Sequence, residues 1–397
     1  MILLGDGFMS DGFTEVTSTG WLQRLGQSFI GVLIGIVIFI ISFPLLFSNE
    51  GRAVRTAQAL AEGEKKVVSV SADKVDPANQ DRLVHVSGLA TTEQELRDPA
   101  FGVAQKAIRL QRTVEMYQWV EKKEESRRKK FGGREETVTN YTYSKEWSRE
   151  LVKSQNFRQA ADHQNPTEMP FRSWEEWAAK VTVGAFQLSS SLEQQINKAD
   201  PLPVSTADLE RVSGANKSKL SVHDGRFFQG DPNSPRVGDV RIAFQVTRPT
   251  TVSVLAKQVG DSFEPFKTSV ANAPLINDLR LGQLSAVEMF QAAEAENTMM
   301  TWLLRGLGYF LMALGISLVF KPLVVMADVV PFIGNLLQMG VGIFAALIAI
   351  PFTLATIAAG WIFYRPLLGI ALLAVATAVI VAIVMLVRSR RRVPARA

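Results

Sequence analysis

The chain has 397 residues, 47% of them hydrophobic, and a formal net charge of +5. Residues 48–301 contain 34 basic and 34 acidic side chains, so the excess positive charge lies outside this region and does not mark a nucleic-acid surface. The chain contains no cysteine, which excludes disulfides, thiolate nucleophiles and cysteine-ligated metal sites.

Four apolar segments predict transmembrane helices, because about 20 apolar residues are needed to cross the hydrocarbon core of a bilayer. They cover residues 29–47, 302–325, 339–364 and 367–387. The uncharged stretch from Val329 to Tyr364 is longer than one span. Its first part, residues 329–338, contains proline, glycine and polar side chains and is interpreted as an interfacial segment. Pro351 is expected to kink the third span.

The basic C-terminal tail, residues 388–397, sets the predicted orientation, since positively charged flanks stay on the cytoplasmic side of a membrane. Four crossings then place the N-terminal tail, residues 1–28, on the cytoplasmic side and residues 48–301 outside the cytoplasm. Residues 1–20 are polar and glycine-rich and lack a basic signal-peptide start, which predicts a mobile tail. Arg365, in the outer turn, opposes this orientation.

The middle region has the patterns of a folded α+β domain. Residues 49–63 have an apolar period near 3.6, which predicts a short amphipathic helix against the membrane or the domain. From Val67 to about Phe266 the period is two, with breaks at Gly, Pro, Asn and Asp, so this part is predicted to be rich in β-strands. The helical period returns at residues 283–296, which predicts a helix leading into the second span. The predicted fold is therefore a multi-pass α-helical membrane protein with a large extracytoplasmic β-rich domain.

One long hairpin is expected within that domain, with Thr113–Glu121 paired to Thr137–Trp147. Alternation places aromatic rings on one face of each strand, which favours cross-strand pairing; they are Tyr117, Trp119, Tyr141, Tyr143 and Trp147. Five rings on one sheet face are expected either in the core or on a surface that docks lipid or a partner. The intervening residues 122–136 are strongly basic. They form either a solvated loop or a contact for anionic lipid or a partner.

No common enzyme signature occurs: Gly-x-Ser-x-Gly and Gly-Lys phosphate-loop motifs are both missing. The three histidines lie far apart in the sequence, without metal-binding spacing. His85 belongs to an alternating strand, His163 to a loop, and His223 to a turn with Asp224 and Gly225. We expect each to be structural, although folding could bring a histidine to a carboxylate for acid–base chemistry. Accordingly, no catalytic, cofactor-binding or metal-binding residue is assigned.

Two further patterns concern charge and packing. Glu115 has apolar and aromatic neighbours and is expected to form an ion pair with a nearby basic residue. Gly31 and Gly35, together with Ala374, Ala378 and Ala382, provide small faces for close helix packing within the chain or between copies. The first, third and fourth spans lack charged interior residues, which argues against an ion channel or a proton-coupled transporter.

Seven segments carry a family resemblance. They are Phe47-Ser48-Asn49-Glu50-Gly51-Arg52-Ala53, Arg82-Leu83-Val84-His85, Val114-Glu115-Met116-Tyr117-Gln118-Trp119-Val120-Glu121, Asn156-Phe157, His163-Gln164-Asn165-Pro166, Val237-Gly238-Asp239-Val240-Arg241 and Gly360-Trp361-Ile362-Phe363-Tyr364-Arg365-Pro366-Leu367. Together they resemble the transmembrane protein 43 family, also called LUMA, over nearly the whole chain beyond residue 20. The resemblance implies four spans and a large extracytoplasmic domain. In animals it implies residence in the endoplasmic reticulum and inner nuclear membrane, where the family scaffolds membrane complexes with lamins and emerin.

The absence of cysteine and the Ala/Arg-rich C-terminus are also compatible with a bacterial member in the cytoplasmic membrane, for which lamins and emerin would not be partners. The leading functional hypothesis is an integral membrane scaffold that contacts lipids and other membrane proteins and forms homo-oligomers. The alternative is a membrane-tethered enzyme that acts on lipid or envelope polymer through His85, His163 or His223 with a carboxylate. A third hypothesis, ligand transport, would require a polar path through the spans.

Overall fold

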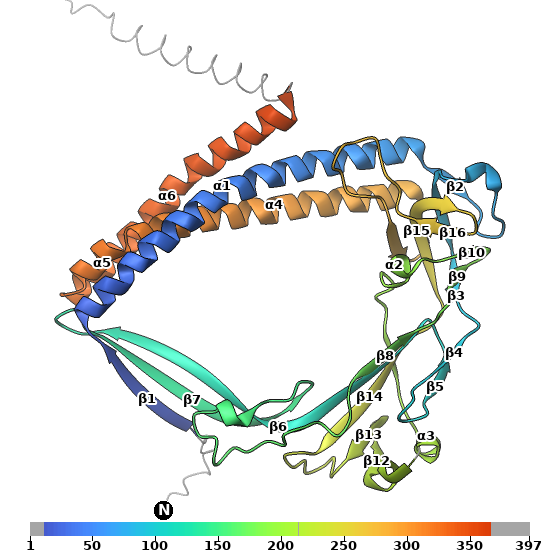
Figure 1. The fold of residues 1–397 in the computed structure, drawn as a ribbon, viewed down its shortest axis with the longest axis horizontal. Coiled ribbons are helices and arrows are strands. Elements are labelled where there is room, and N and C mark those ends of the chain that lie inside the picture. The colour runs from blue at the N-terminus through green and yellow to red at the C-terminus, as the bar shows by residue number, and fades with distance from the viewer. Residues whose placement is uncertain (1–11, 213, 367–397) are drawn as a thin grey trace, which may run out of the picture.

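The computed structural model describes residues 12–212 and 214–366. Long helices lie along one side of the molecule, and a long β-hairpin lies along the other (Figure 1). The two sides meet at both ends, so that the described chain closes into a ring. The predicted fourth span, residues 367–387, and the basic tail, residues 388–397, lie outside the described residues.

Four helices form the helical side: α1 (Trp21–Lys66), α4 (Ala286–Val319), α5 (Lys321–Ala327) and α6 (Pro331–Tyr364). Among the described helices, α1, α4 and α6 are long and apolar enough to cross a membrane. Helix α1 packs along α4, and α6 crosses both.

The helix boundaries correct the sequence-based segments in three places. The first span and the predicted helix at residues 49–63 form one continuous helix, α1, despite Pro44 and Gly51. Residues 302–325 are divided, because α4 ends at Val319 and α5 begins at Lys321. The predicted interfacial segment, residues 329–338, belongs largely to α6, which runs without interruption through Pro351.

A first sheet of eight strands contains the hairpin. Its strand order is β1-β7-β6-β14-β13-β12, with β11 beside β14 and β8 beside β6. The strands are β1 (Gly12–Thr19), β6 (Arg109–Lys129), β7 (Glu135–Ser148), β8 (Trp174–Trp177), β11 (Asp200–Leu202), β12 (Leu220–His223), β13 (Arg226–Gln229) and β14 (Val240–Thr247).

The predicted hairpin is confirmed and is longer than expected. Tyr117 lies opposite Trp147, as the aromatic pattern predicts. The pairing continues through the basic residues to Lys129 opposite Glu135, so most of the segment predicted as a loop is strand. The remaining turn, residues 130–134, is called the hairpin tip. It contains Gly132 and Gly133 at φ 82° and 74°, backbone angles that favour glycine.

The expectation of a mobile tail is wrong for residues 12–19. These residues form β1, which pairs antiparallel with β7 from Gly12 opposite Thr142 to Thr19 opposite Glu135. Only Gly20 separates β1 from α1. The first strand of the described residues thus pairs with a strand that follows it by more than a hundred residues.

A second sheet of seven strands closes on itself, because β3 pairs with both β15 and β9, and β10 and β16 complete the circuit. Its strands are β2 (Val68–Val70), β3 (Leu83–Thr91), β9 (Thr182–Val183), β10 (Phe186–Gln187), β15 (Thr250–Val259), β16 (Ser262–Glu264) and β17 (Asp278–Leu281). The smaller elements are β4 (Glu95–Arg97), β5 (Ala104–Lys106), α2 (Ser190–Glu193), α3 (Thr206–Arg211) and three 3-10 turns at Pro77–Asn79, Ser154–Asn156 and Gly214–Lys219.

Separate apolar clusters hold the parts together. The largest joins the two sheets and includes Phe101, Phe186 and Phe227, all fully buried. A second cluster packs Leu60 of α1 and Phe290 of α4 against the closed sheet. A third lies among α1, α4 and α6 around Leu46 and Met312. The helices are therefore packed on the β domain at one end and on one another over the rest of their length.

Candidate functional site

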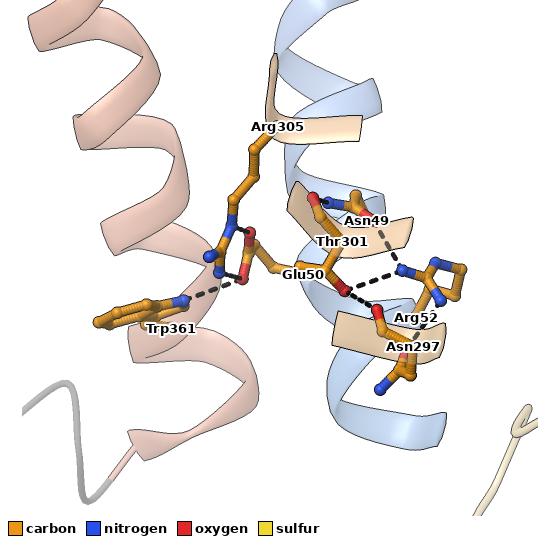
Figure 2. A network of polar contacts seen from close by, with 7 residues as sticks. All are labelled: Asn49, Glu50, Arg52, Asn297, Thr301, Arg305 and Trp361. Atoms are coloured by element: carbon orange, nitrogen blue, oxygen red, sulfur yellow. Dashed lines mark hydrogen bonds and ion pairs between the residues drawn. The ribbon is translucent and has the colours of Figure 1, made fainter. Parts of the chain in front are cut away.

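A buried ion pair connects the three long helices. Arg305 of α4 donates from Nε and Nη2 to the two carboxylate oxygens of Glu50 on α1, each at 2.7 Å. The indole Nε1 of Trp361 on α6 donates to the same carboxylate at 2.8 Å (Figure 2). Glu50 is only 2% exposed, so its charge is removed from solvent and compensated within the protein.

A second set of hydrogen bonds involves Asn49 and Arg52, which flank Glu50 on α1. The Arg52 guanidinium donates to the side-chain oxygens of Asn297 (2.9 Å), Asn49 (3.1 Å) and Thr301 (3.0 Å). Asn49 in turn donates to the backbone carbonyl of Thr301. We call the seven residues of Figure 2 the interhelix polar network; they are Asn49, Glu50, Arg52, Asn297, Thr301, Arg305 and Trp361.

Glycines bring α6 close enough for this network to form. A Cβ on Gly360 would lie 2.9 Å from the Cβ of Glu50, and a Cβ on Gly51 would lie 2.5 Å from the Tyr364 ring. The Arg305 guanidinium also lies over the Trp302 ring, with Cζ 4.8 Å from its centroid. Such aromatic residues are frequent at the membrane–water interface. The network therefore stands at the end of the uncharged segment of α1, where an interface is expected.

A second polar cluster stands at the opposite end of that segment. Asp328, between α5 and α6, is fully buried and forms ion pairs with Arg24 of α1 (2.6 Å) and Lys129 of β6 (2.7 Å). Arg24 also pairs with Glu135 of β7 at 3.1 Å. We call these four residues the closure cluster, because they join the hairpin to the helices.

Backbone hydrogen bonds reinforce this junction. Arg24 donates to the carbonyl of Gly133 at 2.8 Å, and the Gly132 amide donates to the carbonyl of Val329 at 3.0 Å. The Trp21 indole donates to the carbonyl of Val325. The hairpin tip is thus docked on the beginning of α1 and on the α5–α6 turn through both side chains and backbone.

His85 and His223 occupy the positions that the sequence predicts. His85 is buried in β3, and its ring nitrogens contact the Leu284 carbonyl and the Ser69 hydroxyl. Burial lowers the pKa of His85 below its ordinary value of 6.5. His223 lies at the β12–β13 turn beside Asp224, which has a φ of 47°.

His163 packs with the hairpin aromatics. It stacks on Tyr143 at 3.8 Å between ring centroids and meets the edge of Trp119 at 4.6 Å. Tyr143 is buried and donates to Glu121, and desolvation raises the pKa of Tyr143 to about 12. The three histidines therefore lie on separate elements, and the structure does not bring them together.

The other hairpin aromatics are only half-buried and Tyr143 alone is buried, so the core expectation holds for Tyr143, and the remaining rings form a partly covered face. Trp147 packs on Tyr117 and lies beneath the Arg241 guanidinium. The predicted ion pair of Glu115 is confirmed, because Arg241 donates to Glu115 at 2.6 Å. These contacts fix the base of the hairpin.

A cavity of about 580 Å³ lies between α1, α4 and residues 272–278. Apolar side chains, including Leu60, Ile276 and Phe290, form part of its wall. Charged Arg52, Asp278, Arg280 and Glu296 form another part, with Arg280 paired to both carboxylates. This volume is within the range of small-molecule sites. Within the described residues, no group of three or more His, Asp or Glu side chains is arranged to hold a metal ion.

Sequence reasoning missed both polar clusters. Glu50 and Arg305 are 255 positions apart, so no local period connects them. A signal for one cluster was nevertheless present, because Asn49, Glu50, Arg52 and Trp361 all lie in segments that carry the family resemblance.

The long apolar helices and the large polar β domain define an integral membrane protein. A family model described as Transmembrane protein 43 matches residues 116–366. The chain is 37% identical to Transmembrane protein 43 of Rattus norvegicus over 394 residues, covering 96% of this chain and 95% of the relative. It is 37% identical to the Homo sapiens protein over 388 residues, covering 95% and 94% of the two chains. It is 29% identical to the Drosophila melanogaster homolog, covering 86% and 90%. No solved structure matches. The chain belongs to the transmembrane protein 43 family.

Proposed function

We propose that this protein is an integral membrane scaffold, which holds a rigid polar domain against the bilayer and organises other membrane proteins around it. The observation that carries the proposal is the closed frame, in which ion pairs fix the β domain to the helices at two separate places: Arg280 of β17 pairs with Glu296 of α4, and Lys129 of β6 pairs with Asp328. Removing one partner of a buried pair leaves the other charge uncompensated, so such pairs hold the two joined elements in one arrangement.

The surface of the frame is suited to holding partners. The helices expose many large apolar side chains, including Leu33 and Ile40 of α1 and Leu347 of α6. Lipids, other membrane proteins and further copies of this chain are the proposed occupants of this surface. We further propose residence in the endoplasmic reticulum and inner nuclear membrane for a eukaryotic source, and in the cytoplasmic membrane for a bacterial one.

The extracytoplasmic placement of the β domain, expected from the sequence, also stays a proposal. Positive flanking charge supports the cytoplasmic placement of residues 388–397. The pairing of β1 with β7 argues against opposite sides of the membrane for residues 1–28 and the β domain, because paired strands lie in the same compartment.

Crosslinking in native membranes, followed by purification of the full chain and blue-native electrophoresis, tests the scaffold proposal. A scaffold should appear in complexes larger than the monomer, with crosslinks from the helices or domain to defined neighbours. Glu50→Gln should weaken those complexes, whereas Glu93→Gln, which changes an exposed side chain, should not. A monomer without crosslinked neighbours would contradict the proposal.

The alternative of a membrane-tethered enzyme has no observation in its favour. It is tested by replacing His85, His163 and His223 separately with Gln. An enzyme should lose cellular function at one of them while keeping its fold. A scaffold should tolerate His223→Gln, since that side chain lies at an exposed turn.

A further inference from the structure

The hairpin is long, and its outer half is strongly charged. Strand β6 has 21 residues, which at about 3.3 Å per residue corresponds to roughly 70 Å. Residues 24–60 of α1 correspond to about 54 Å at 1.5 Å per residue. Figure 1 shows the hairpin running from the beginning of α1 into the β domain, whose closed sheet packs against the other end of α1.

Both ends of α1 are attached to the same polar domain. At its beginning, Arg24 contacts the hairpin through Glu135 and Gly133. At its end, Leu60 packs into the cluster with Leu83 and Leu255 of the closed sheet. Strand β1, directly before α1, also belongs to the sheet of the hairpin.

The outer half of the hairpin cannot cross a bilayer. Residues 121–130 carry nine charged side chains, and positions 122–128 are all exposed. A charged side chain at the bilayer centre costs about 2.5–3.5 kcal/mol even on insertion scales, so such a segment would be strongly excluded. If α1 crossed the membrane between its two attachments, this hairpin would have to cross beside it.

The uncharged part of α1 nevertheless requires lipid. Residues 25–49 contain no charged side chain, and Phe29, Leu33, Val37 and Ile40 are all exposed. The tip of the hairpin is apolar at its outermost point, because Phe131 is 85% exposed beside the docked glycines. Exposed Phe332 follows the α5–α6 turn to which this tip is docked. Phe131 and Phe332 are therefore expected to contact the lipid hydrocarbon. They lie at the end of the ring that also contains the closure cluster.

We propose that the ring is attached to one face of the bilayer: α1 enters and leaves the membrane through the same face, and its middle is immersed in the near leaflet. Residues 12–20, the hairpin and the β domain then lie together on one aqueous side. The occupant of the apolar helix surface is a lipid leaflet. A layer of helices in one leaflet displaces lipid on that side only, so it would bend the membrane. This inference concerns attachment and does not depend on the scaffold role.

The absence of native cysteine allows a direct test with single cysteines in the full chain. Gln23→Cys and Glu64→Cys place exposed thiols at the two ends of α1, and Val37→Cys places one in its apolar middle. Sealed membrane vesicles are treated with an impermeant maleimide before and after permeabilisation. One-sided attachment predicts that positions 23 and 64 label from the same side and that position 37 is protected until detergent is added. Labelling of positions 23 and 64 from opposite sides would overturn the proposal.

A second experiment, disulfide crosslinking, gives a result that does not depend on the orientation of the vesicles. Thr17 and Thr137 lie opposite each other in β1 and β7. Thr17→Cys/Thr137→Cys should therefore form a disulfide in intact membranes on mild oxidation, detected as a crosslinked peptide. Thr17→Cys/Thr142→Cys is the matched control, since Thr142 pairs with Gly12 and lies several residues away. If the register pair fails to crosslink more than the control while the protein remains folded, the proposal is wrong.

Discussion

Gly35 of α1 and Gly315 of α4 lie in direct backbone contact: a Cβ on Gly35 would lie 2.7 Å from the Gly315 carbonyl oxygen. The small face predicted from Gly31 and Gly35 therefore packs within the chain. Helices can approach this closely only where side chains are absent.

Gly35→Ala should push α1 and α4 apart and lower the unfolding midpoint in detergent, because the added methyl group meets backbone on both sides. An overpacked contact typically costs about 1–3 kcal/mol. Gly26→Ala is the control, since its Cβ would have no neighbour within 4 Å. That variant should be neutral or slightly stabilised. Equal midpoints for the two variants would contradict the close contact.

Glu50→Gln should destabilise the protein by about 3–5 kcal/mol, because it leaves the Arg305 guanidinium in a largely buried position without its counter-charge. The double variant Glu50→Gln/Arg305→Met should recover part of this loss. Both are measured by thermal unfolding in detergent. Glu93→Gln, which breaks an exposed pair with Lys106, should cost less than about 1 kcal/mol. A double variant no better than the single one would show that the charges are not coupled.

Acidification should reduce stability through His85. Its pKa is lower in the folded protein than in the unfolded chain, so the unfolded chain binds the proton more readily. The contribution of neutral, buried His85 to the free energy of unfolding is therefore complete above the ordinary pKa of 6.5. It is lost as the pH falls below that value. Unfolding midpoints at pH 7.5 and 5.5 should differ more for the wild type than for His85→Gln. An unchanged difference would exclude His85 as the source.

Trp119→Ala should destabilise the hairpin base, since the ring packs on His163 and beneath Lys145. A fully buried aromatic costs about 3–5 kcal/mol on truncation, and the half-buried Trp119 should cost about 2 kcal/mol. The same variant should leave liposome sedimentation of the protein unchanged. Loss of liposome binding without loss of stability would instead identify these rings as a lipid-docking face.

Local patterns predicted the elements whose partners are close in sequence. The Tyr117–Trp147 hairpin, the buried strand of His85 and the helices were recognised because each period belongs to the segment itself. The boundaries were less accurate, since the apolar runs were ended at charged or polar residues such as Ser48 and Gln338, whereas α1 and α6 continue through these positions.

Long-range contacts could not be predicted in this way. Strand β1 is short and largely exposed, and its identity depends on the free edge that β7 provides. Asp328 looks like a turn residue in the sequence, and only the fold brings Arg24 and Lys129 to it. Both polar clusters are therefore products of topology rather than of local sequence.

The closure cluster also has a consequence for the order of events during synthesis. Asp328 is made 304 residues after Arg24. At about 5–20 residues per second, a ribosome needs roughly 15–60 s to cover that interval. Arg24 is present throughout this time, and the hairpin is present once Ser148 has been made, but the Asp328 carboxylate that pairs with both Arg24 and Lys129 is still missing. Contacts of such high sequence separation form late, so closure must follow delivery of α4 and α5 to the membrane. A chain interrupted before Asp328 would leave Arg24 and Lys129 without the carboxylate that they share, so the ring could not close in the way that the full chain does.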